Sequence, residues 1–272
     1  MINEKELAYR YDLIISTEWQ ERFDELIFGK FEIPDEGQVL IFNCGTGTLS
    51  IEIAERLKAG EVFALDPSPE RLKIARAKAA VKKLDNIIFE QDEKGARRLL
   101  ESTFDAVIAD ASLLPAIEYR VQVRSAIEKA ARVSRPDALV LLSLATRGSF
   151  DEFFSIYWES LHDCNLDQRV WTELEEIINA RPTAAEAEEL CRQAGLRKVE
   201  SVTTTEGFEF PSGAEFLESP LIKDTFLDDW LSVLEIDDQD QVRDRMISII
   251  DEERGGGAFY ISIRATVIAA RR

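Results

Sequence analysis

The sequence has few of the residues from which disulfide-linked or metal-stabilised folds are built. Its three cysteines, Cys44, Cys164 and Cys191, are odd in number and far apart, and no CxxC spacing occurs. His162 is the only histidine. Neither a disulfide framework nor a zinc site is therefore predicted, and we expect no metal ligands. Free thiols are typical of a reducing compartment, so we expect a cytoplasmic protein.

Basic charge and long apolar runs are also scarce. The chain has 52 acidic and 33 basic residues, which give a net charge of −19. This charge repels phosphates at long range and argues against a nucleic acid partner. No apolar run approaches the ~20 residues of a membrane span, and residues 1–11 mix acids and bases with apolar residues. We expect a soluble, unexported protein without a membrane span.

Residues 39–49, VLIFNCGTGTL, carry the clearest functional signal. An apolar run, a glycine turn and a helix-like segment follow one another directly. Gly45 and Gly47 allow the backbone to approach a ligand closely, and the following helix would present unpaired N–H groups. A second apolar run, 61–65, is followed by Asp66, which lies about twenty residues after the first glycine of the turn. In nucleotide-binding folds an acid at this spacing binds a ribose diol. Alternatively, the turn simply joins a strand to a helix.

Short apolar runs alternate with amphipathic segments between residues 39 and 144, which predicts a doubly wound α/β sheet. Helices are expected at 69–84, where Ser68 can cap the first turn, and at 117–133. The expected strands are 38–42, 61–65, 87–90, 104–109 and 138–144. The side chains expected to face the core are Leu72, Ala75, Ala79 and Val81 in the first helix and Ile117, Val121, Val123, Ile127 and Ala131 in the second.

The second half of the chain shows helix starts followed by two further strands. Residues 149–152 and 183–186 both have capping-box spacing, so each is expected to open a helix, and Gly195 is expected to end the second. Residues 196–202 and 260–270 are predicted to be strands because apolar residues run or alternate through them.

Three units of the chain are expected from this pattern. Residues 1–34 form an N-terminal helical cap, and residues 35–272 form the α/β domain. Residues 206–253 form a helical insertion, because they contain too many apolar side chains to remain in water. This insertion is either an extra layer on the core or a lid over a substrate cavity. The N-terminal aromatic residues either pack a leading helix on the sheet or fold across the ligand site: Tyr9, Tyr11, Trp19 and Phe23.

The ordered motifs resemble those of the class I S-adenosylmethionine-dependent methyltransferases, over residues 35–272, and in particular those that act on small molecules. The matching segments are LIFNCGTG (40–47), ALDPSPERLKIAR (64–76), FEQDE (89–93), TFDAVIAD (103–110) and ARVSRPDALVLLS (131–143). The resemblance implies a Rossmann-like, mostly parallel sheet of seven strands in the order 3-2-1-4-5-7-6. Its last strand is antiparallel, and the cofactor binds at the carboxyl ends of the first strands.

The resemblance also implies a set of cofactor-binding residues. Gly45 and Gly47 would line the methionine and ribose, Asp66 would accept the ribose hydroxyls, Asp92 would bind the adenine amino group, and Asp110 would border the sulfonium. The complete set carried over is Asn43, Gly45, Gly47, Asp66, Pro67, Asp92, Glu93 and Asp110. The aspartates keep structural alternatives, such as capping a helix or lying in a solvated loop.

Two positions depart from the family pattern. Ile41 stands where the family usually has an acid, and Asn43 stands at the first glycine of the turn. Asparagine tolerates left-handed dihedrals, so the turn can persist. The missing carboxylate weakens cofactor binding by roughly ten- to a hundredfold, if a charged hydrogen bond contributes about 1.5–3 kcal/mol. A nicotinamide-dependent oxidoreductase is a weaker alternative, because Ser50 replaces the third glycine of GxGxxG.

The predicted function is methyl transfer from S-adenosylmethionine to a small, apolar or aromatic acceptor, with S-adenosylhomocysteine as the product. Such an in-line displacement depends mainly on holding donor and acceptor in position, so no dedicated base is required. His162 is expected to lie at the surface or at the edge of the core, or else to act as a base. The alternative is a catalytically degenerate relative that acts by binding.

Overall fold

Seven strands form one mixed sheet in the order β3-β2-β1-β4-β5-β7-β6, which confirms the predicted topology. We describe the protein from a computed structural model, which places residues 3–91, 103–253, 255 and 257–272. β7 runs antiparallel to both of its neighbours, and the other pairs are parallel. The strands are β1 (Glu36–Phe42), β2 (Ala59–Asp66), β3 (Ile87–Gln91), β4 (Phe104–Asp110), β5 (Ser134–Thr146), β6 (Arg197–Phe210) and β7 (Phe259–Arg271).

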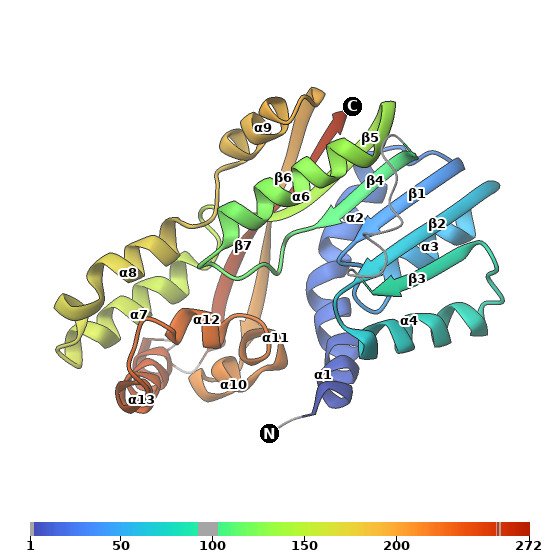
Figure 1. The fold of residues 1–272 in the computed structure, drawn as a ribbon. Helices are drawn as coiled ribbons and strands as arrows, with labels where there is room; N and C mark the ends of the chain where they lie inside the picture. The colour runs from blue at the N-terminus through green and yellow to red at the C-terminus, as the bar shows by residue number, and fades with distance from the viewer. Residues whose placement is uncertain (1–2, 92–102, 254, 256) are drawn as a thin grey trace.

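Helices cover both faces of this sheet (Figure 1). The even and odd positions of each strand face different layers, as the two-residue period of a strand requires. Leu40 packs in the cluster that contains α6 (Tyr119–Val133) and α9 (Ala184–Gln193). Val39 and Ile41 pack in the larger cluster, which contains α3 (Thr48–Arg56), α4 (Pro69–Val81), α7 (Asp151–Asp163) and α8 (Asp167–Asn179). A strand buried on both faces explains the unbroken apolar run of β1.

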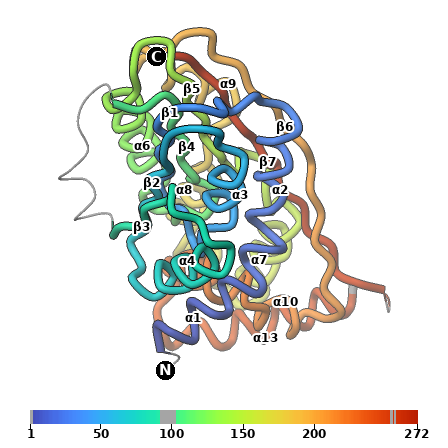
Figure 2. Tube along the Cα trace, turned by 90° about the vertical axis from the view of Figure 1, so that its right-hand side faces the viewer, coloured from blue at the N-terminus to red at the C-terminus, as the bar shows by residue number. Residues whose placement is uncertain are grey.

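The N-terminal segment is one continuous helical stretch that joins the larger cluster. It consists of α1 (Glu4–Arg10), the π-helix η1 (Tyr11–Gln20) and α2 (Glu21–Lys30). Figure 2 shows α1 beside α4, near the end of the sheet where the strands β1 and β2 finish. A π-helix of this length is rare, and π-helical turns are frequent at functional sites.

The segment before β7 is a layer of four helices: α10 (Gly213–Glu218), α11 (Pro220–Lys223), α12 (Leu227–Leu231) and α13 (Ile236–Glu253). It packs on α7 and on η1. Residues 206–210, which the sequence placed in this helical insertion, instead continue β6, because Phe210 pairs with Phe259 of β7. The apolar side chains at 208 and 210 are buried along the strand instead of on a helix.

The three predicted helix starts are confirmed, since α4, α7 and α9 begin at Pro69, Asp151 and Ala184, but one of them lacks the expected capping box. Ser68 caps α4 by accepting a hydrogen bond from the Arg71 amide, and Thr183 and Glu186 form a complete capping box on α9. Gly195 follows α9 in the left-handed conformation, as expected. Residues 149–152 form no capping box, because the Glu152 carboxylate accepts hydrogen bonds from the Ser262 amide and hydroxyl. Tertiary contacts with β7 replace the local cap there.

The predicted helix faces are correct for most positions. Leu72, Ala75 and Ala79 of α4 and Val123, Ile127 and Ala131 of α6 are buried. Val81, Ile117 and Val121 are exposed. Val81 is the last residue of α4, and residue 117 precedes α6, so neither lies on the face that packs against the sheet.

Candidate functional site

The turn between β1 and α3 adopts the left-handed backbone that its sequence requires. Asn43, Gly45 and Gly47 have φ values of 55°, 58° and 83°. The Asn43 side-chain amide donates to the Asp110 carbonyl at 2.7 Å, which ties the end of β1 to the end of β4. A Cβ atom on Gly47 would lie 2.9 Å from the Cβ of Ala75, so the turn packs directly against α4. Asparagine therefore serves in place of the usual first glycine of the turn.

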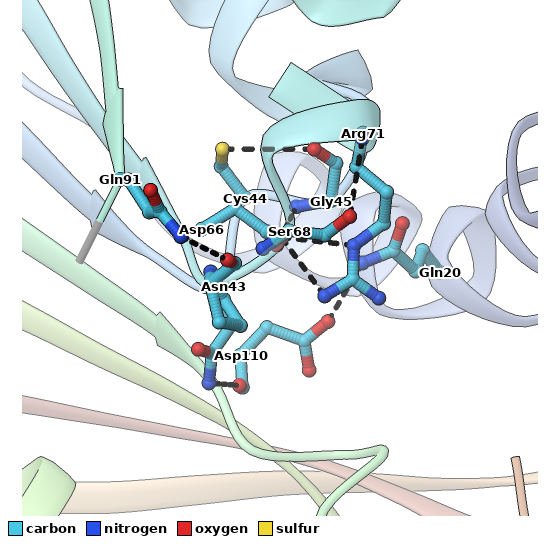
Figure 3. A network of polar contacts seen from close by, with 10 residues as sticks. Gln20, Asn43, Cys44, Gly45, Asp66, Ser68, Arg71, Gln91 and Asp110 are labelled. Atoms are coloured by element: carbon cyan, nitrogen blue, oxygen red, sulfur yellow. Dashed lines mark hydrogen bonds and ion pairs between the residues drawn. The ribbon is translucent and has the colours of Figure 1, made fainter. Parts of the chain in front are cut away.

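Asp66, the last residue of β2, points its carboxylate at this turn (Figure 3). Its oxygens accept hydrogen bonds from the Gly45 amide at 2.9 Å and the Ser68 amide at 2.8 Å. Arg71 completes the set with Nε 2.8 Å from Oδ1. Asp66 is only 1% exposed, and burial raises its pKa although Arg71 lowers it. Asp66 is thus held in one position and is hydrogen-bonded directly to the glycine turn.

Pro67 follows Asp66 and lines a cavity of about 460 Å³ at this edge of the sheet. The Pro67 carbonyl accepts a hydrogen bond from the Gln91 side chain at 3.0 Å. The cavity also touches Tyr11, Arg71 and Asp224, from three different parts of the chain. Asp92 and Glu93, the predicted adenine-binding residues, lie outside the described residues.

Asp110 ends β4 on the other side of the turn. One carboxylate oxygen accepts the Gln20 side-chain amide and the other accepts the Ser112 backbone amide, each at 2.9 Å. Asp66 and Asp110 therefore flank the 43–47 turn from the two strands that neighbour β1. The structure brings together the six described residues of the predicted set: Asn43, Gly45, Gly47, Asp66, Pro67 and Asp110.

The N-terminal π-helix covers this turn. A Cβ atom on Gly45 would lie 2.7 Å from a ring carbon of Tyr11 and 3.0 Å from the Gln20 side-chain oxygen. The Arg71 guanidinium lies over the Tyr11 ring at 4.7 Å from its centroid. The Trp19 indole donates to the Ser112 hydroxyl at 2.9 Å, just beyond Asp110. Side chains from η1 thus fill the space in front of the turn, whereas Tyr9 is 51% exposed.

A second, very small cavity of about 20 Å³ lies behind Gln20. Asp24 of α2, Ile41, Asn43 and Asp110 all line it. Burial, together with the nearby charge of Asp110, raises the pKa of Asp24 well above its usual value. The position beside Ile41 therefore contains a carboxylate that comes from α2 instead of from β1.

Three contributors to the site could not be found from the sequence: Gln20, Asp24 and Arg71. Each reaches the turn from a helix, and only Arg71 lies close in sequence to a predicted residue. Its position five residues after Asp66, in the first turn of α4, was the one available signal. His162 lies on the surface at the end of α7, with its side chain 74% exposed and paired with Asp167.

Comparisons with known proteins agree with this architecture. A family model described as a methyltransferase domain matches residues 39–137. YqeM of Bacillus subtilis strain 168, whose name describes it as a methyltransferase, is 27% identical over 162 residues. Residues 39–137 are thus similar to methyltransferase domains, and the whole chain shares their fold. The match with YqeM covers 55% of this chain and 63% of YqeM, which is less than two thirds of that relative.

Solved structures of other proteins share the fold at low sequence identity. The YcgJ protein of Bacillus subtilis superimposes with a TM-score of 0.60 at 16% identity, over 93% of this chain and 98% of YcgJ. Phosphoethanolamine N-methyltransferase 2 of Haemonchus contortus, solved with S-adenosylmethionine, gives 0.56 at 13% identity, over 99% of this chain and 57% of that one. Among the described residues, no helix has the length and apolar character needed to cross a membrane.

The residues around the turn are those predicted to bind the donor, but side chains occupy the space in front of the turn. The left-handed turn and Asp66 have the required positions, and the Thr46 hydroxyl is buried there without a hydrogen-bond partner in the described structure. Tyr11 and Gln20 lie against Gly45. The donor set therefore fits S-adenosylmethionine once these two side chains have moved.

Proposed function

We propose that the protein transfers the methyl group of S-adenosylmethionine to a small, apolar or aromatic acceptor. The observation that carries the proposal is the direct hydrogen bond between Asp66 and the Gly45 amide, which joins a strand-end acid to a left-handed glycine turn. A sugar diol is bound by an acid in this position, and a close backbone approach requires the glycines. In this proposal Asp66 binds the ribose, and Gly45 and Gly47 border the methionine.

The remaining donor contacts complete the same site. Asn43 shapes the turn, Pro67 lines the adjoining cavity, and Asp110 borders the sulfonium, to which its negative charge is attracted. Asp92 and Glu93 bind the adenine. The bound cofactor supplies an electrophilic methyl group, and the chain's residues orient the acceptor toward it.

In this proposal Asp24 supplies the carboxylate that is missing because Ile41 stands where the family usually has an acid. It lines the small cavity beside Ile41 and lies close enough to Asp110 for the two charges to repel each other. A cationic amino group placed between these carboxylates would relieve their repulsion. We infer that Asp24 binds the amino group at the methionine end of the cofactor.

We expect Asp24→Asn to make the protein more stable at neutral pH and to weaken binding of S-adenosylhomocysteine. A raised pKa in the folded state means that folding favours the protonated acid, so wild-type stability falls as pH rises through that pKa. The variant's gain in free energy of unfolding is therefore absent at low pH, near the unfolded value of about 3.9, and is fully present above the folded pKa.

Urea denaturation at several pH values measures this gain. Glu25→Gln, on the exposed side of the same helix, is the matched control and is expected to show neither effect. A wild-type pH profile in Asp24→Asn would contradict the assignment.

The acceptor site is proposed to lie on the β4 and β5 side, beyond Asp110. There the Trp19 ring stacks on Phe150 and Phe208 at 5.9 and 5.8 Å between centroids, and Phe226 lies 5.1 Å from it. An apolar or aromatic acceptor could replace these ring–ring contacts with little loss of packing energy. The displacement needs no general base. Burial raises the pKa of Tyr119 to about 12, so this tyrosine stays protonated at neutral pH.

A catalytically degenerate binding protein is the second candidate. Ile41 removes the family's strand acid, and Tyr11 covers Gly45. If this covering is permanent, the chain retains the fold without using the donor. The thiols of Cys164 and Cys191 are free, which supports a cytoplasmic setting for either function.

Titration calorimetry on the full chain tests the proposed function. We expect S-adenosylmethionine and S-adenosylhomocysteine to bind and NADH not to bind, because the third glycine of the dinucleotide pattern is missing. If neither sulfur compound binds at millimolar concentration, the methyltransferase proposal fails. Binding of both without release of S-adenosylhomocysteine, across a panel of small acceptors, would favour the degenerate alternative.

A further inference from the structure

Arg181 is a buried guanidinium without an acidic partner. It lies between α8 and α9, is 4% exposed, and forms no ion pair with any carboxylate in the described part of the chain. Its Nη1 atom has no hydrogen-bond partner there. Three aromatic rings surround the group, with centroids 4.9 Å (Tyr119), 5.2 Å (Phe150) and 5.8 Å (Phe226) away.

Aromatic contacts alone do not account for this burial. An arginine remains charged at neutral pH, and a buried ion without a counter-ion is strongly unfavourable. Each cation–π contact recovers only part of that loss. The Tyr119 side chain is hydrogen-bonded to the guanidinium, and the nearby acid Asp229, whose Oδ2 accepts the Ala116 amide at 2.6 Å, attracts it without forming an ion pair. The buried guanidinium is thus only partly compensated by negative charge.

The group lies on the side of the site where the acceptor is proposed to bind. Phe150 and Phe226, which flank Arg181, also contact the Trp19 ring. Trp19 in turn is bonded to Ser112, two residues from Asp110. Movement of the N-terminal segment that uncovers the donor turn would therefore also loosen the aromatic rings over Arg181.

We propose that Arg181 binds an anionic group of the methyl acceptor, a carboxylate or a phosphate, while the surrounding rings hold its apolar or aromatic body. This deepens the proposed function and rests on it. Guanidinium groups suit both anions because their N–H donors form a planar fork. The acceptor is therefore an amphipathic acid, and Arg181 is the residue that selects it.

A structural role is the alternative, in which Arg181 only ties α6, the start of α7 and the helical layer before β7 together through its ring contacts. The two roles differ in stability. If Arg181 serves to bind an anion, its buried charge destabilises the protein while no anion is bound. Arg181→Met is therefore expected to unfold at an equal or higher temperature than the wild type. A structural tie predicts a lower unfolding temperature for that variant.

Binding of simple probes tests the proposal on the full chain. Benzoate, phenyl phosphate and benzamide share a phenyl ring and differ in charge. We expect one or both anions to bind the wild type by calorimetry at least about tenfold more tightly than benzamide, the effect of one charged hydrogen bond. If only benzoate binds, the anionic group of the acceptor is a carboxylate, and if only phenyl phosphate binds, it is a phosphate.

Variants at position 181 and a surface control complete the test. Arg181→Met should lose the preference for anions, Arg181→Lys should keep part of it, and Arg192→Met, at an exposed arginine paired with Glu188, should keep all of it. No preference in the wild type, a preference that persists in Arg181→Met, or a lower unfolding temperature for Arg181→Met would overturn the proposal.

The two proposals can fail separately. The probes are titrated without cofactor, so anion binding does not depend on the donor site. Loss of cofactor binding with retained anion preference would remove the methyltransferase proposal and leave Arg181 as an anion-binding residue without a methyl acceptor. The reverse would remove only the role of Arg181.

Discussion

Replacing Asp66 by alanine is expected to weaken the binding of S-adenosylhomocysteine by roughly ten- to a hundredfold. A hydrogen bond to a charged group contributes about 1.5–3 kcal/mol, and ~1.4 kcal/mol corresponds to tenfold in affinity. In addition, the substitution removes the acceptor that positions the Gly45 amide. Calorimetry measures the affinity, and circular dichroism checks that the variant is folded.

Asp105 offers a matched control for this substitution. Like Asp66, it accepts a backbone amide, that of Gln38 at 2.8 Å, and pairs with an arginine, Arg135 at 2.7 Å. It lies near the start of β4, at the opposite end of the sheet from the glycine turn. Asp105→Ala should leave the affinity unchanged. An equal loss in both variants, or no loss in Asp66→Ala, would contradict the ribose assignment.

Trp19→Ala is expected to lower the free energy of unfolding by about 3–5 kcal/mol, the usual range for a fully buried aromatic residue. Trp19 is completely buried, contacts four aromatic rings, and donates to Ser112. The substitution would leave a cavity between η1, β6 and the C-terminal helical layer. Urea denaturation measures the loss.

Trp171→Ala is the matched control, because Trp171 is 48% exposed and contacts one ring, that of Trp158. Its expected loss is much smaller. Trp19→Phe should lie between, since it keeps most of the packing and loses a hydrogen bond of about 1 kcal/mol. If Trp19→Ala were no more destabilising than Trp171→Ala, η1 would not be docked as described.

The parts of the fold that the sequence predicted are those encoded locally. The apolar run of β1 is buried on both faces, and the residues after it need left-handed dihedrals that Asn43 and the glycines accept. Ser68 and Thr183 cap helices with neighbours three residues away. Family motifs then supplied the strand order, which no local pattern contains.

The features that the sequence did not predict depend on contacts between distant segments. Ser149 and Glu152 have the spacing of a cap but bond to β7 instead. Residues 206–210 continue β6 because β7 is long enough to pair with them. Likewise, Gln20 and Arg181 gain their significance only from groups about ninety and sixty residues away that the fold brings beside them.

A crystal structure of the full chain with S-adenosylhomocysteine tests the central claim most directly. The account predicts that the adenosyl group lies against Gly45, with its ribose hydroxyls bonded to Asp66, and that Tyr11 and Gln20 have moved away from the turn. Tyr11 remaining on Gly45, with the ligand absent or bound elsewhere, would contradict it.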